Sequence, residues 1–102
     1  DYMEINVKYI LNYIQILKIS SEIFSKDPSK FSPFISFLLF SSYYYPKDYM
    51  YISEKIIKRY DNGKLNKRDL EKISDKFSDI GSQEDIYIRI KKLIEYAKKI
   101  LD

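Results

Sequence analysis

Basic side chains gather in the segment from residue 55 to residue 76. Those that we expect to contact phosphate groups are Lys55, Lys58, Arg59, Lys64, Lys67, Arg68 and Lys72. A run of tyrosines precedes them, and Tyr45 and Tyr49 are the candidates for stacking on bases. Phosphate binding needs clustered cations, and base stacking needs exposed aromatic rings beside them. The segment therefore predicts a nucleic-acid contact, whereas a solvated lysine-rich surface over packed tyrosines would need no ligand.

Charged residues also recur at four-residue spacing between residues 68 and 79. The two stripes are Arg68, Lys72, Lys76 and Glu71, Asp75, Asp79. Paired carboxylates can act as acid and base or hold a metal ion. They can equally form a solvated helix face with alternating charges. Because no histidine and no second carboxylate cluster completes a site, we predict no catalytic residue, metal or cofactor, and no enzyme.

The stretch YDNGKLNKRDLE is similar to the second half of a calcium-binding loop. Calcium would also need oxygen ligands at the first and third positions of such a loop. Those two positions hold Lys58 and Tyr60. The stretch is therefore interpreted as a helix end at Gly63 followed by a new helix capped by Asn66.

The amino-acid composition narrows the classes of functional site that remain. The chain of 102 residues has no cysteine or histidine, which removes thiolate metal sites, disulfides and the usual general base. Its 45% hydrophobic and 32% charged residues are typical of a globular chain, and a net charge of +3 is mild. Isoleucine, lysine and tyrosine dominate, as AT-rich codon usage also produces, so this bias has a genomic explanation beside a functional one.

The length predicts one helical domain over residues 1–102. The sequence opens at Asp1 rather than methionine, so a trimmed protein and a domain excised from a longer chain both stay open. No signal peptide or lipidation motif is visible, and we expect a cytoplasmic protein without membrane contact.

Apolar periodicity and capping residues predict an all-α fold, a compact single-domain bundle of about five helices. We expect the first helix over Met3–Ile19, with Asp27 and Pro28 in the following loop. Ser32 is expected to cap the second helix, with Pro33 at its first position. The third helix should run from Pro46 to Tyr60. The fourth should begin after Asn66 and end at Gly81, and the fifth should begin after Ser82.

The same periodicity predicts which side chains form the core. In the first helix they form an apolar stripe of Tyr9, Ile10, Tyr13, Ile14 and Leu17. Leu11, Ile16 and Ile19 widen this stripe, so we expect the helix to be buried on more than one side. The second helix carries no charge between Lys30 and Lys47, and we expect it at the centre of the bundle. In the third helix Tyr49, Ile52 or Ser53, Ile56 and Tyr60 should face inward. In the last two helices the expected core residues are Leu70, Ile73, Phe77, Ile80, Ile86, Ile90, Leu93, Ile94, Ala97, Ile100 and Leu101.

The stretch FSPFISFLLF, which follows a tyrosine- and isoleucine-rich helix, resembles the helical domain of primase large subunits and of their cysteine-free accessory relatives. Small helical subunits of CRISPR effector complexes are similar in size and composition. Either resemblance implies an accessory role in a nucleic-acid-processing complex. No functional residue is carried over, because residues 26–31 hold no arginine and the chain holds no cysteine.

Two functions are therefore expected. The first is a non-catalytic accessory subunit of a nucleic-acid-processing complex, of the replication or CRISPR type, which contacts single-stranded DNA or RNA through the third and fourth helices. The second is a protein-interaction or oligomerisation module with an aromatic and aliphatic docking surface. A large apolar patch left exposed on the folded monomer would favour the second function.

Overall fold

The computed structural model describes the backbone of residues 2–80 and 85–102, and the side chains of residues 7–80 and 85–102. The described part folds into five α-helices without a strand, which confirms the expected all-α bundle. They are α1 (Tyr2–Ile23), α2 (Pro28–Tyr44), α3 (Pro46–Asp61), α4 (Lys67–Ser78) and α5 (Ile86–Leu101). None of the described helices combines the length and the apolar character that crossing a bilayer requires.

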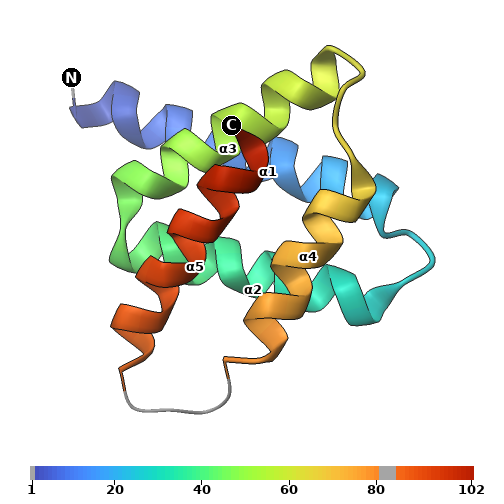
Figure 1. Cartoon of the computed structure of the whole chain (residues 1–102). Helices are drawn as coiled ribbons and strands as arrows, with labels where there is room; N and C mark the ends of the chain where they lie inside the picture. The colour runs from blue at the N-terminus through green and yellow to red at the C-terminus, as the bar shows by residue number, and fades with distance from the viewer. Residues whose placement is uncertain (1, 81–84) are drawn as a thin grey trace.

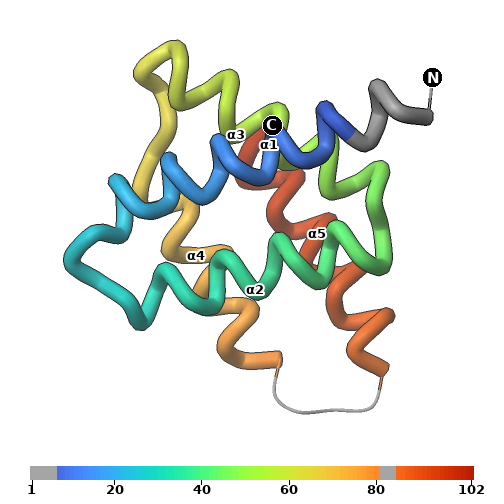
Figure 2. Tube along the Cα trace, turned by 180° about the vertical axis from the view of Figure 1, so that it is seen from behind, coloured from blue at the N-terminus to red at the C-terminus, as the bar shows by residue number. Residues whose placement is uncertain are grey.

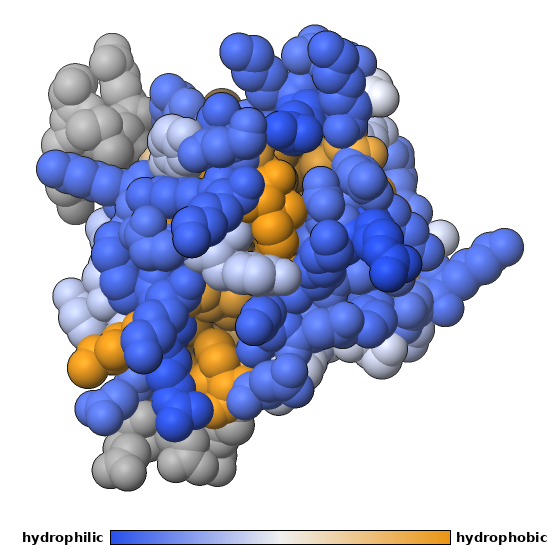
Figure 3. Space-filling view, viewed as in Figure 1, coloured by the Kyte–Doolittle hydropathy of each residue, from blue (hydrophilic) through white to orange (hydrophobic). Residues whose placement is uncertain are grey.

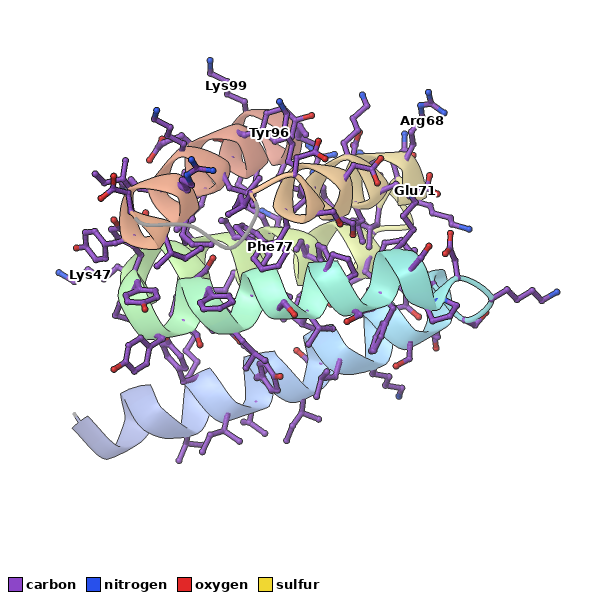
Figure 4. The ribbon with its side chains drawn as sticks, turned by 90° about the horizontal axis from the view of Figure 1, so that it is seen from below. Lys47, Arg68, Glu71, Phe77, Tyr96 and Lys99 are labelled. Carbon is purple, nitrogen blue, oxygen red and sulfur yellow. The ribbon has the colours of Figure 1, made fainter. Side chains whose placement is uncertain are left out.

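The second helix lies at the centre of the bundle, as expected. It packs against each of the other four helices, and Figure 4 shows it between α1 on one side and the α4–α5 pair on the other. Phe34, Phe37 and Leu38 are fully buried along its inner side. The radius of gyration of the Cα atoms is 13.0 Å, which matches a compact chain of about 100 residues.

The predicted start of α2 was wrong. The helix begins at Pro28, and Pro33 lies inside it. Proline suits the first helical position because the N–H that it lacks would have no partner there. Pro28 therefore opens the helix, and Asp27 accepts a hydrogen bond from the Ser29 hydroxyl at 2.5 Å instead of capping the backbone. Pro28, which was expected in the loop before the helix, is therefore its first residue.

The predicted burial of α1 was also partly wrong. Ile16 and Ile19 are buried, but Ile10, Leu11 and Ile14 are 60%, 55% and 55% exposed. The helix packs on α3 and α2 through one side only. On that side Asn12 is buried and its amide donates a hydrogen bond to the Ser53 hydroxyl at 3.3 Å. The helix thus has two apolar faces, and the bundle covers one of them.

The boundaries of α3 and α4 follow the capping residues predicted from the sequence. Pro46 opens α3, and Gly63 takes the left-handed conformation, with φ of +68°, two residues after its end. The Asn66 side chain accepts a hydrogen bond from the Arg68 backbone N–H at 2.9 Å and so caps α4. The expected end at Gly81 and cap at Ser82 lie outside the described residues.

The predicted burial of the core residues of α4 and α5 is confirmed for those near the middle of each helix. Leu70 and Ile73 of α4 and Ile90, Ile94 and Ala97 of α5 are fully buried. Among the other expected core residues, Leu93 and Leu101 are buried, while Phe77, Ile80, Ile86 and Ile100 are partly buried against the core. In α3 the expected inward residues are buried except Tyr60, which is 38% exposed and donates a hydrogen bond to Glu22.

Candidate functional site

Six basic residues lie where α3 ends and α4 begins. We call them the basic corner: Lys58, Arg59, Lys64, Lys67, Arg68 and Lys72. The turn at residues 62–66 joins the two helices (Figure 1). The Lys64 backbone N–H donates to the Arg59 carbonyl at 2.8 Å, which closes the end of α3. The local fold therefore follows from the glycine turn and the Asn66 cap, which hold the basic residues at one end of the bundle.

Most of the basic corner is open to solvent. Lys58, Lys64, Lys67, Arg68 and Lys72 are exposed and Arg59 is half-buried. Within the described side chains none of the six lies within salt-bridge distance of a carboxylate, although Asp61, Asp69 and Glu71 are close in sequence. Lys55 differs, because its ammonium lies 3.3 Å from the Asp102 carboxylate.

Arg68 and Lys72 share a surface hollow with a residue that the sequence did not point to. The hollow has a volume of about 250 Å³ and is lined by Lys30, Arg68, Glu71, Lys72 and Asp75. Figure 4 shows Arg68 and Glu71 on the outer side of α4. Lys30 comes from the first turn of α2, pairs with Asp75, and its carbonyl accepts a hydrogen bond from the Ser74 hydroxyl at 2.7 Å. The charges of Lys30 and Asp75 cancel each other, so the remaining charges of the hollow are those of Arg68, Lys72 and Glu71.

The two tyrosines expected to stack on bases lie elsewhere. Tyr49 is fully buried, so its ring is closed to any ligand. Tyr45 is half-buried, and its hydroxyl donates to the Tyr87 carbonyl at 2.9 Å. It precedes α3, whereas the basic corner begins in the last turn of that helix, about 20 Å away at 1.5 Å per residue. The expectation that both rings lie beside the basic residues, which was based on their closeness in the sequence, is therefore wrong. The basic corner offers cations without these two aromatic rings.

The buried hydroxyl of Tyr49 has no hydrogen-bond partner among the described residues. Its ring packs on that of Tyr9 with centroids 4.8 Å apart, and the Tyr9 hydroxyl donates to the Ser42 carbonyl at 2.9 Å. Burial raises the pKa of Tyr9 to about 12 and also raises that of Tyr49. A buried polar group without a partner keeps its desolvation cost, whereas a bonded one regains most of it.

This contrast predicts opposite effects of two similar substitutions. Tyr49→Phe should leave the free energy of unfolding unchanged or raise it by about 1 kcal/mol, because it removes an unpaired hydroxyl. Tyr9→Phe should lower it by about 1 kcal/mol, because it removes a paired one. Urea unfolding at neutral pH followed by circular dichroism measures both. A loss for Tyr49→Phe as large as that for Tyr9→Phe would show that the Tyr49 hydroxyl is bonded.

A second hollow lies between α4 and α5. Its volume is about 360 Å³, and its lining residues are Lys76, Asp79, Ile80, Arg89, Lys92, Leu93 and Tyr96. Figure 3 shows an apolar seam between hydrophilic flanks on this side of the molecule. The Lys76 ammonium lies 5.1 Å from the centroid of the Tyr96 ring, and Arg89 donates to the Ile80 carbonyl at 2.6 Å. Two of its cations therefore already have partners within the chain.

The exposed aromatic residues of α2 pack largely against one another. Phe40 stacks on Tyr44 with centroids 6.2 Å apart, and Tyr44 contacts Tyr87 edge-on at 5.6 Å. Tyr43 is 79% exposed, and its ring contacts that of Tyr44 at 4.9 Å. This cluster joins α2 to α5 and leaves Tyr43 and Tyr87 exposed, the latter by 52%.

The largest aliphatic exposure lies on α1. We call Val7, Ile10, Leu11 and Ile14 the α1 outer face. Their exposed fractions are 50%, 60%, 55% and 55%. The helix runs across the front of the molecule in Figure 2, on the side opposite α5. Spacings of three, four and seven residues put the four side chains within an arc of about 100°, the width of an ordinary buried helix face.

Neither a metal site among the described residues nor a similarity to a known protein adds to the candidate surfaces. Among residues 7–80 and 85–102, no three acidic side chains gather closely enough to hold a metal ion. No protein-family model matches the chain, and no curated protein or solved structure matches it either.

Proposed function

We propose that this chain is a protein-interaction module whose docking surface is the α1 outer face. The observation that supports it is the exposure of four aliphatic side chains, each by half or more, along one side of one helix. Together they expose on the order of a few hundred Å² of apolar surface, which is the size of the largest patch on a typical monomer, and such a patch is often functional.

The binding free energy that a partner could gain favours this surface over the charged ones. Burying a whole Val, Leu or Ile side chain contributes about 1.5–3 kcal/mol, so covering the exposed half of each contributes about 1 kcal/mol. A surface ion pair contributes about 0–1 kcal/mol and weakens with salt. Four adjacent aliphatic side chains therefore give a partner more binding free energy than the same number of exposed ion pairs.

The proposal is tested by site-specific photo-crosslinking in an extract of the source cells. A photoreactive residue at position 10 is compared with one at position 88, since Ile88 is exposed to a similar extent, 52%, on another helix. We expect a defined adduct from position 10 that is lost when Leu11→Glu and Ile14→Glu are added. The adduct partner is identified by mass spectrometry and titrated in purified form, where the same variant should weaken binding at least about tenfold. Equal labelling from both positions would contradict the proposal.

The basic corner supports a second candidate function, contact with a nucleic acid as an accessory subunit of a processing complex. Its specific support is six cations on one corner, five of them exposed. Because Tyr45 and Tyr49 are not beside them, binding would rest on phosphate contacts and would depend steeply on salt and little on sequence. This candidate carries less weight than docking, because acids close by offset part of the charge.

Fluorescence anisotropy with labelled single-stranded and duplex oligonucleotides tests the second function. The double variant Lys58→Glu/Arg59→Glu removes cations from the corner, and Lys47→Glu, at the other end of α3, is the matched control. Phosphate binding predicts that the slope of the logarithm of the binding constant against the logarithm of the salt concentration falls in magnitude by about 1 per lost contact in the double variant. In the control the slope should not change. The absence of binding even at low salt would remove this function and leave docking unaffected.

A further inference from the structure

We propose that the α1 outer face binds the same face of a second copy of this chain, with the two α1 helices antiparallel. The inference rests on the proposed docking function and names its partner. It is carried by the arrangement of the four aliphatic residues, by the charges around them and by the area that they offer.

The arrangement of the face is symmetric along the helix. Val7 and Ile14 lie equally far from the midpoint between Ile10 and Leu11. An antiparallel pair with its two-fold axis at that midpoint puts residue 7 opposite residue 14 of the copy, and residue 10 opposite residue 11. A two-fold interface requires such a self-complementary patch, in which each residue meets its counterpart across the axis.

The charges around the face permit this pairing. Within residues 7–14 the one charged residue is Lys8, and its ammonium already lies 2.9 Å from the Glu54 carboxylate on α3. At about 100° per residue, Lys8 lies at the flank of the face rather than on it. Lys18, which is exposed, continues the stripe of residues 7, 11 and 14 by one turn beyond the face. In the antiparallel pair the two Lys18 residues are about 22 Å apart along the axis at 1.5 Å per residue, so two copies do not bring these lysines into contact. Between Val7 and Ile14 the face offers no charge that would select an oppositely charged partner, which favours an aliphatic surface of the same kind.

The area of the face sets the strength of the dimer. A stable interface of standard size buries about 800 Å² on each partner. The four half-exposed side chains offer on the order of a few hundred Å² of apolar surface. The pairing should therefore be reversible and concentration-dependent, with a dissociation constant in the micromolar range or weaker, and not a permanent dimer.

Sedimentation equilibrium of the purified chain over a wide concentration range tests the dimer. The average mass should rise from that of one chain toward twice that value. Ile10→Glu/Ile14→Glu should abolish the rise, and Ile88→Glu, which changes an equally exposed isoleucine on α5, should leave it unchanged. Melting temperatures of the variants check that they still fold, as expected for side chains that are more than half exposed.

Cysteine variants test the antiparallel direction without relying on disruptive changes, because the chain has no cysteine of its own. In the proposed pair, position 7 of one copy faces position 14 of the other, whereas the two positions 7 are about 10 Å apart along the axis at 1.5 Å per residue. Disulfides need Cα atoms within about 7 Å. A mixture of Val7→Cys and Ile14→Cys chains should therefore oxidise to a covalent dimer about tenfold faster than either alone.

The outcomes separate the inference from the function on which it rests. A chain that stays monomeric at every concentration overturns the self-pairing. If position 10 nevertheless crosslinks to another protein, the docking function stands with a different partner. Faster oxidation of each single cysteine variant than of their mixture would overturn the antiparallel direction. Loss of the mass increase in Ile88→Glu would place the contact on α5 and overturn the α1 interface.

Discussion

Replacing Phe37 with alanine is expected to lower the free energy of unfolding by about 3–5 kcal/mol. The side chain is fully buried in α2, the helix that contacts all the others. Its removal loses the transfer free energy of the ring and leaves a cavity that four neighbouring helices cannot readily fill. Since a domain of this size is stable by about 5–15 kcal/mol, the loss would remove a large share of the total stability.

Urea unfolding monitored by circular dichroism measures this effect. Leu39→Ala is the matched control, because Leu39 is in the same helix but is 48% exposed, and we expect it to cost less than about 1 kcal/mol. A loss below about 1 kcal/mol for Phe37→Ala would mean that Phe37 lies outside the core, and that α2 is not the central element.

Replacing Asp48 with alanine is expected to cost about 1.5–3 kcal/mol, because it removes two hydrogen bonds to charged groups. Asp48 lies in the first turn of α3, and its side chain is 18% exposed. One carboxylate oxygen lies 2.9 Å from the Lys91 ammonium and the other lies 2.6 Å from that of Lys98. The residue therefore joins α3 to α5 across a partly buried contact. Removing it leaves two lysines without this partner.

The Asp48 network should also make stability depend on pH. Burial alone would raise the pKa of the Asp48 carboxyl, but the hydrogen bonds from Lys91 and Lys98 outweigh it and hold that pKa below its ordinary value. An acid whose pKa is lower in the folded state stabilises the fold above its unfolded pKa, which is about 3.9. This contribution is lost as the pH falls through the lowered folded value.

Asp48→Asn isolates this effect, because it keeps an oxygen acceptor and removes the charge. Unfolding of the wild type and of the variant is compared at pH 7 and below pH 3. We expect the wild type to be more stable at pH 7 and the difference to shrink in acid, when Asp48 becomes protonated. A difference that stays constant with pH would show that the carboxylate charge contributes nothing to the contact between α3 and α5.

The helix ends in this chain were predictable where local chemistry determines them. Pro46, Gly63 and Asn66 act through their own backbone or side chain within a few residues, and each does what its type predicts. The start of α2 was not predictable in this way, because Pro28 and Pro33 both satisfy the local rule. Choosing between them requires the packing of residues 28–32 against the rest of the bundle.

The surfaces were harder to predict than the helices. A helical periodicity marks apolar side chains but does not say how many neighbours the helix will have, so the exposure of Ile10 and Ile14 was missed. The pairing of Lys30 with Asp75 joins residues that are 45 positions apart and has no local signal. Tyr45 and Tyr49 are near the basic residues in the sequence, yet the length of α3 and the burial of Tyr49 separate them from the corner.

The most direct test of the α1 outer face is a concentration series of two-dimensional ¹H–¹⁵N NMR spectra of the purified chain. If two copies pair through this face, the chemical shifts that change with rising protein concentration should be those of Val7, Ile10, Leu11 and Ile14. The chemical shifts of the basic corner and of the α4–α5 hollow should stay unchanged. Changes that cluster in either of those two regions, or spectra that do not change at any concentration, would contradict the pairing.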